Sequence, residues 1–154
     1  MNTITFFIPG PPVGKQRARS ATRIGKGADG QAKAMTRHYT PAKTANYEAL
    51  VSWIAKQAIG SQPLLTGPVD VVMRIFVPVP ASWSKRRRAL ALAGLVLPTV
   101  KPDIDNIEKA VYDALNKVVW QDDVLVCDVV KSKRYAEQPG VKVTIKPIEN
   151  AQAA

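Results

Sequence analysis

Two acidic residues, Asp103 and Asp105, stand two positions apart in the stretch KPDIDNIEK, and Lys109 follows four residues after the second. Another acid, Asp123, ends the run WQDD further along the chain. Seven of the twelve Asp and Glu residues lie between positions 103 and 128, although Lys and Arg number 22. The cluster is either the solvated face of one helix with its flanking loop, or a cation site inside a basic protein.

The structural interpretation explains part of this pattern. An Asp in the first turn of a helix accepts bonds from free backbone N–H groups and complements the helix dipole, which suits Asp103 as an N-cap. Asp105, Lys109 and Asp113 are spaced four residues apart and would form an ion-pair ladder on one helix face. Capping explains one Asp easily and two with difficulty, and a ladder alone does not require the second acidic cluster downstream.

The chemical interpretation is a metal site. If the entry to the helix and the entry to the following strand meet in space, Asp103, Asp105 and Asp123 surround one point. Carboxylates that converge without a partner repel one another, and a divalent cation removes that cost. Oxygen ligands suit Mg²⁺, with Mn²⁺ as a substitute, whereas the single Cys127 and single His38 are too few for a closed zinc site.

Such a cation eases hydrolysis of a phosphodiester, because it activates water and neutralises charge on the phosphate. Lys109, one helical turn from Asp105, would stabilise the charge that develops at phosphorus or orient the attacking water. The acids and Lys109 together therefore predict a nuclease site.

The net charge of +10 points to a polyanionic partner. Nucleic acid is the leading expectation, and an anionic membrane surface is the rival, supported only by Trp83 and the bases after it. No apolar run approaches the roughly 20 residues that cross a bilayer, so we expect a cytoplasmic protein without a membrane partner. The candidate DNA-contacting residues are Lys15, Arg17, Arg19, Lys85, Arg86, Arg87, Arg88 and Lys101.

The elements that position these residues follow from periodicity and turn signals. Strands are expected at 3–8, 69–77, 124–135 and 141–145. A helix should run from a Thr40 cap and Pro41 to Gly60, with Trp53 in the core or against another helix. A short helix capped by Ser82 or Ser84 should end at Gly94, and another should start at Asp103.

Three further expectations concern exposure and mobility. Residues 15–40 are rich in Gly, small and basic residues and predict a mobile basic loop, either a DNA-contacting arm or a merely solvated surface. Residues 147–154 predict a flexible tail. Cys127 sits in the apolar run VLVCDVV and is expected to be a buried structural thiol.

The run KPDIDNIEKAVYDALNKVVWQDD, with a strand and the basic KSKRY after it, resembles the RusA family of Holliday junction resolvases of bacteria and their prophages. The upstream PASWSKRRRALALAG and the closing VKVTI also fit, so the likeness covers most of the chain. It implies an α+β single domain over 1–154, with a small mixed β-sheet packed against two main helices.

The resemblance also implies a homodimer that resolves four-way DNA junctions by paired, Mg²⁺-dependent nicks and uses no small-molecule cofactor. By motif, Asp103 and Asp105 match the family's D-x-D carboxylates, Asp123 its later acid and Lys109 its essential lysine. The first three would then be metal ligands. Val124 and Leu125 depart from the small residue and Gln that many members carry after DD.

A different class of function competes with this one. The competing hypothesis is a non-catalytic basic DNA-binding protein in which the acids only cap and solubilise a helix. That hypothesis predicts DNA binding in EDTA and no strand scission with any metal.

Overall fold

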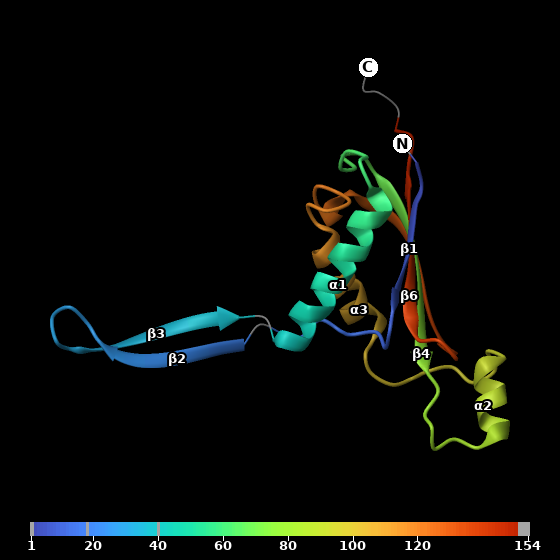
Figure 1. Ribbon diagram of the computed structural model, residues 1–154, viewed down its shortest axis with the longest axis horizontal. Coiled ribbons are helices and arrows are strands. Elements are labelled where there is room, and N and C mark those ends of the chain that lie inside the picture. The colour runs from blue at the N-terminus through green and yellow to red at the C-terminus, as the bar shows by residue number, and fades with distance from the viewer. Residues whose placement is uncertain (1, 18, 40, 151–154) are drawn as a thin grey trace.

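The computed structural model describes residues 2–17, 19–39 and 41–150, without the side chain of Arg19. Thr40, the expected helix cap, therefore lies outside the described residues. Figure 1 shows three parts: a sheet with helices against it, a hairpin that extends away to the left, and a short helix beyond the lower end of the sheet.

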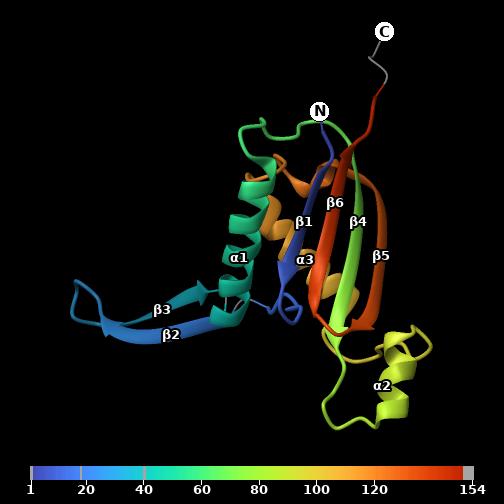
Figure 2. The ribbon, with the colours of Figure 1, turned by 45° about the vertical axis from the view of Figure 1, so that its right-hand side comes forward.

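The central sheet has four strands in the order β1 (Ile4–Pro9), β6 (Gly140–Pro147), β4 (Val69–Pro78) and β5 (Val126–Ala136). β6 is antiparallel to β1 and β4, whereas β4 and β5 are parallel. Every second residue of β1 and β4 is buried, as expected for strands with one covered face. This mixed sheet confirms the predicted fold class (Figure 2).

Helices α1 (Ala42–Ile59) and α3 (Ile104–Leu115) lie on the same face of the sheet and contact each other. The Ser52 hydroxyl on α1 donates a hydrogen bond of 2.8 Å to the Ala114 carbonyl on α3. Helix α1 ends at Gly60, as predicted, with a positive φ of 59° that favours glycine. The helices and the covered sheet face enclose one hydrophobic core.

The prediction for Trp53 is wrong, because its side chain is 65% exposed. The buried stripe of α1 runs through Tyr47, Val51 and Ala55. Two residues beyond Val51, a helix has turned by about 200°, so Trp53 faces away from the core.

Helix α2 (Lys85–Leu92) lies beyond the end of β4 and contacts β5. The Arg87 N–H donates to the Ser84 hydroxyl at 3.2 Å, so Ser84 is the N-cap. The Arg87 guanidinium lies 3.7 Å from the centre of the Trp83 ring, and that ring meets Tyr135 of β5 edge-on. These contacts fasten α2 to the sheet.

The expected loop over 15–40 is instead mostly an antiparallel hairpin of β2 (Arg19–Lys26) and β3 (Ala32–Tyr39). The turn is closed by a bond of 2.8 Å from the Gly27 N–H to the Gln31 carbonyl and by the Asp29 carboxylate, which accepts from the Gln31 N–H at 3.1 Å. Gly30 adopts the positive φ of 81° that this turn needs. Composition suggested a loop because pairing between strands is not a local property of either strand.

Two further expectations concern the edges of the fold. The prediction for Cys127 is wrong, because its side chain is exposed on β5, an outer strand with β4 as its only paired neighbour in the described chain. The predicted tail is described as far as residue 150, and there the Ile148 N–H donates to the Pro68 carbonyl at 2.9 Å. Residues 151–154 lie outside the described residues. None of the described helices has the length and apolar character needed to cross a membrane.

Candidate active site

Asp103 caps helix α3, as its position predicted. Its Oδ1 accepts a hydrogen bond of 3.0 Å from the Asn106 N–H. Asp105, in the first turn of the helix, has a side chain that is 88% exposed. The D-x-D motif therefore presents one carboxylate that caps the helix and one that is open to solvent.

Lys131 of β5 lies between two acids of α3. Its Nζ is 3.5 Å from Asp105 Oδ1 and 3.0 Å from Glu108 Oε2. Glu108, and then Asp105, raise the pKa of Lys131 despite the opposing effect of its partial burial. The predicted ladder is absent: in the described chain Lys109 forms no salt bridge with Asp105 or Asp113.

Lys133, two residues along β5, fixes the chain that leads into α3. Its ammonium donates to the carbonyl oxygens of Val100 at 2.8 Å and of Pro102 at 3.1 Å. Lys131 and Lys133 alternate with Ser132 and so project from the same face of the strand. The basic segment of β5 thereby positions both the D-x-D entry and the first turn of the helix.

Lys15 joins three segments on the other side of α3. Its ammonium contacts Glu48 of α1 and lies 3.1 Å from Asp113 of α3. Burial alone would lower the pKa of Lys15, but hydrogen bonds with the two carboxylates raise it overall. Two acids thus already neutralise a lysine that was predicted to contact DNA.

A pocket of about 460 Å³ lies beside the N-terminus of α3. Three lysines line it together with Asp103 and Asn106: Lys15, Lys43 and Lys101. Its wall is tight at Gly14, where an added Cβ would lie 3.0 Å from Pro102 Cβ and 3.2 Å from Asn106 Cβ. This pocket combines positive charge with a helix N-terminus, both of which favour an anion.

Asp123 lies at the other end of α3. It opens a short 3₁₀ helix, Asp123–Leu125, placed by the fully buried Trp120, whose Nε1 donates to Asn116 Oδ1 at 2.7 Å. Partial burial raises the pKa of Asp123, and the neighbouring acids Asp122 and Asp113 raise it further, against the lowering effect of Asn116. Asp123 is thus a destabilised carboxylate close to the last turns of the helix.

The three predicted ligands therefore do not meet at one point. Asp103 caps the start of a 12-residue helix, which spans about 18 Å, and Asp123 lies near its end. In the described chain, no three His, Cys, Asp or Glu side chains are grouped closely enough to hold a metal ion. The acids instead follow one face of the helix, because Asp105, Glu108 and Tyr112 share a face and Asp123 adjoins Tyr112.

Tyr112 connects the two ends of this acidic face. Its ring is buried and packs edge-on against Trp120, with centroids 5.2 Å apart. Burial raises the pKa of the Tyr112 hydroxyl, and Glu108 and Asp123 raise it further. The hydroxyl consequently stays protonated beside two carboxylates at neutral pH.

Apart from Lys15, the predicted DNA-contacting residues fall into three groups. Lys85, Arg86 and Lys101 are exposed, as is Arg17 ahead of the hairpin. Arg87 packs on Trp83, and Arg88 is half-buried. The side chain of Arg19 lies outside the described part of the structure.

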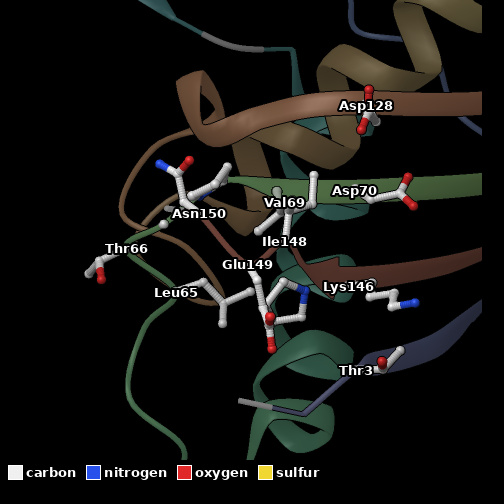
Figure 3. A pocket seen from close by; sticks show the side chains of 13 residues that line it. Thr3, Leu65, Thr66, Val69, Asp70, Asp128, Lys146, Ile148, Glu149 and Asn150 are labelled. Carbon is white, nitrogen blue, oxygen red and sulfur yellow. The ribbon is translucent and has the colours of Figure 1, made fainter. Parts of the chain in front are cut away.

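A larger pocket of about 1230 Å³ is lined by none of these acids (Figure 3). It lies where β4 and β5 begin and β6 ends. Asp70 and Asp128, which are paired across these two strands, and Glu149 line it, whereas none of the predicted catalytic residues does. Asp70 and Asp128 are neighbours in the strand register, Glu149 follows the end of β6, and the three carry no further sign of a site.

Sequence reasoning did not single out Glu108, Tyr112, Lys131 or Lys133. Glu108 and Tyr112 stand three and seven residues after Asp105, a spacing that places them on one helix face. That signal was present in the sequence. The roles of Lys131 and Lys133 depend on which strand lies beside α3, and no local pattern contains this information.

Comparison with known proteins agrees with the resemblance. The model of a family described as endodeoxyribonuclease RusA matches residues 9–146. An uncharacterized protein of Bacillus subtilis (strain 168), YqaN, is 36% identical over 150 residues, which cover 96% of this chain and 99% of that protein.

Proposed function

The chain belongs to the RusA endodeoxyribonuclease family, and from this premise we propose that it resolves four-way DNA junctions by paired, Mg²⁺-dependent nicks. Membership supports an endonuclease of the Holliday junction resolvase type. The observation that carries the finer proposal is the acidic face of α3, flanked by lysines in a chain of net charge +10. A basic exterior attracts DNA, and the acids provide the place where a phosphodiester is cut.

The N-terminal end of α3 fits a hard divalent cation. Its donors are carboxylate oxygens, and Mg²⁺ is usually held by one or two carboxylates together with substrate phosphate oxygens and water. Asp103 and Asp105 would supply this pair. When bound, the cation would neutralise charge on the phosphate and acidify water. Asp103, Asp105 and Asp123 do not fit one ion as a trio, so the ligand role predicted for Asp123 is not supported by this arrangement.

The chain's own cations complete the proposed site. Lys109 is exposed one turn after Asp105 and would reach a phosphate held at that end of the helix. Lys131 keeps Asp105 and Glu108 side by side, and Lys133 fixes the backbone before Asp103. Lys101, at the rim of the lysine-lined pocket, would bind the neighbouring phosphate of the same strand.

A two-fold homodimer belongs to the same proposal, because symmetric incision of opposed strands needs two active sites. The outer edge of β5 supports it. In the described chain this 11-residue strand pairs only with β4, and it exposes Val129 and Val130 by 41% and 51%, while Val124 in the preceding 3₁₀ helix is 79% exposed. Exposed apolar edges of this length are usually covered in a native assembly.

The decisive experiment is cleavage of a labelled synthetic four-way junction in Mg²⁺, with linear duplex of the same sequence alongside. We expect paired nicks on the junction alone. Asp105→Asn should lower the nicking rate at least about 100-fold, since the proposed cation stabilises the transition state by several kcal/mol. Asp70→Asn is the matched control, because it makes the same change in the larger pocket, which none of the predicted catalytic residues lines, and should leave the rate unchanged.

One observation favours a second function, a non-catalytic DNA-binding protein: the three predicted ligands lie apart in the structure. This alternative predicts tight junction binding without nicking in Mg²⁺ or Mn²⁺. Full nicking by Asp105→Asn would show instead that the chain is a nuclease with a different active site.

A further inference from the structure

The β2–β3 hairpin is an arm outside the core. All its described side chains are exposed, and its strands form a two-stranded sheet of their own. Figures 1 and 2 show it leaving the molecule near the start of α1 and extending away from the central sheet. The core therefore gives no reason for the hairpin to be there.

The strand register sorts the side chains of the hairpin onto two different faces. Residues paired across an antiparallel ladder share a face, and successive residues alternate. Arg23 pairs with Met35, Arg37 with Ala21, and Lys33 with Gly25, so the three bases share one face. The same face carries Met35, which is 62% exposed, and we call it the arginine face.

The opposite face is mainly neutral. Thr22 and Thr36 meet there, with their hydroxyl oxygens 3.2 Å apart, and Ser20, Ala32 and Ala34 share that side. Lys26, next to the turn, is its one Lys or Arg among the described side chains. Neither strand contains an acid, since Asp29 lies in the turn. The positive charge of the arm is thus concentrated on one side and has no internal partner.

We propose that the arginine face binds the sugar–phosphate backbone of duplex DNA. Arg forms bidentate bonds with phosphate oxygens, and a two-stranded β-ribbon fits the major groove. Eight residues per strand span roughly 26 Å, whereas the major groove is about 12 Å wide. The hairpin is therefore long enough to reach the phosphates that border the groove. Met35 would lie against sugar or base edges between the phosphate contacts.

DNA is favoured over a second copy of the chain on grounds of charge. A second copy of a chain whose net charge is +10 repels a basic arm, whereas the duplex carries one negative charge per about 1.7 Å of axis. The proposal deepens the proposed function, on which it rests for the identity of the nucleic acid. It assigns the hairpin to a duplex arm of the substrate, away from the bond that is cut at α3.

The test uses Asp105→Asn as a background, so that binding is measured without cleavage. Arg23→Gln with Arg37→Gln removes two charges from the arginine face. The control, Lys26→Gln with Lys142→Gln, removes the same charge from the opposite face of the hairpin and from an exposed position on β6. Dissociation constants for a labelled four-way junction and for linear duplex are measured at several salt concentrations.

We expect the arginine-face variant to weaken binding of both DNAs about tenfold or more, whereas the control changes it little. The slope of log K against log salt should fall by about two, because each lost phosphate contact removes about 0.9. Melting temperatures should be equal, since the hairpin lies outside the core.

Binding equal to that of the control would overturn the proposal. So would unchanged DNA binding together with a loss of self-association in sedimentation, because the arm would then contact a second copy. The two proposals fail separately. If the unsubstituted protein nicks no branched DNA but the arginine-face variant loses duplex binding, the proposed function is wrong and the role of the hairpin stands.

Discussion

At the scale of single residues, Asp123 is where function and stability conflict. Burial and the acids Asp122 and Asp113 raise its pKa, so its ionised form disfavours the folded state. A residue kept only for structure would not need that cost, and perturbed carboxylates of this kind are typical of functional sites.

We therefore expect Asp123→Asn to lower the nicking rate at least about 100-fold and to raise the melting temperature at pH 7 by on the order of 1 °C. The sign follows from linkage: a raised pKa in the folded state destabilises the fold as pH rises through the unfolded value of 3.8. The rise in melting temperature should vanish near pH 3, where the Asp123 carboxyl of the unsubstituted protein is protonated. Calorimetry at both pH values and the junction assay measure the two effects.

Nicking at the unsubstituted rate by Asp123→Asn would remove this residue from the mechanism and leave the acids at the start of α3 to act alone. A lower melting temperature at pH 7 would show instead that Asp123 stabilises its surroundings. Asp122→Ala is the matched neighbour. The Asp122 carboxylate caps the 3₁₀ helix by accepting from the Val124 N–H at 2.9 Å, so we expect its truncation to lower stability.

At the scale of secondary-structure elements, Lys15 fastens α1 and α3 to the segment that follows β1. Its backbone N–H donates to the Asn106 carbonyl at 2.8 Å, while its ammonium meets Glu48 and Asp113. Removing the ammonium leaves two carboxylates facing each other between the two helices. Their spacing then depends on core packing alone.

Lys15→Met should therefore lower the free energy of unfolding by about 1–2 kcal/mol at pH 7, measured by urea denaturation. Folding raises the pKa of Lys15 above 10.5. The difference in the free energy of unfolding between Lys15→Met and the unsubstituted protein should therefore persist below that pH and disappear as the pH rises above it. Lys142→Met, at an exposed position on β6, is the control and should change stability by less than about 0.5 kcal/mol. An equal effect of both substitutions would show that the three-way contact contributes nothing.

The elements differ in how far sequence could predict them. Helix α3 was predictable because its cap at Asp103 and its apolar stripe are local. The hairpin was not, because its pairing joins residues up to 20 positions apart, as in Arg19 with Tyr39, and neither strand has a buried face. The separation of Asp103 from Asp123 was equally hidden, since it depends on where the chain after Trp120 returns to the sheet.

At the scale of the whole molecule, the proposed mechanism needs two copies. We predict that a mixture of unsubstituted and Asp105→Asn chains, unfolded and refolded together, forms heterodimers that cut one strand of a junction. Such products are nicked junctions that stay intact on a native gel and show one shortened strand under denaturing conditions. A mixture with Asp70→Asn should give full resolution.

Complete loss of nicking in the heterodimers would mean that each cut needs both intact sites. Full resolution by the Asp105→Asn mixture would contradict the two-site model, once sedimentation has shown that the chains had exchanged.

The hairpin has a consequence for how such proteins diversify. Its strands begin and end in exposed chain, its side chains pack against nothing in the core, and its two ends leave the body close together (Figure 2). An appendage attached in this way can lengthen, shorten or change its residues over evolution without altering how the rest of the chain folds. The length of DNA that a relative grips and the bond that it cuts can then be selected independently, from one inherited scaffold.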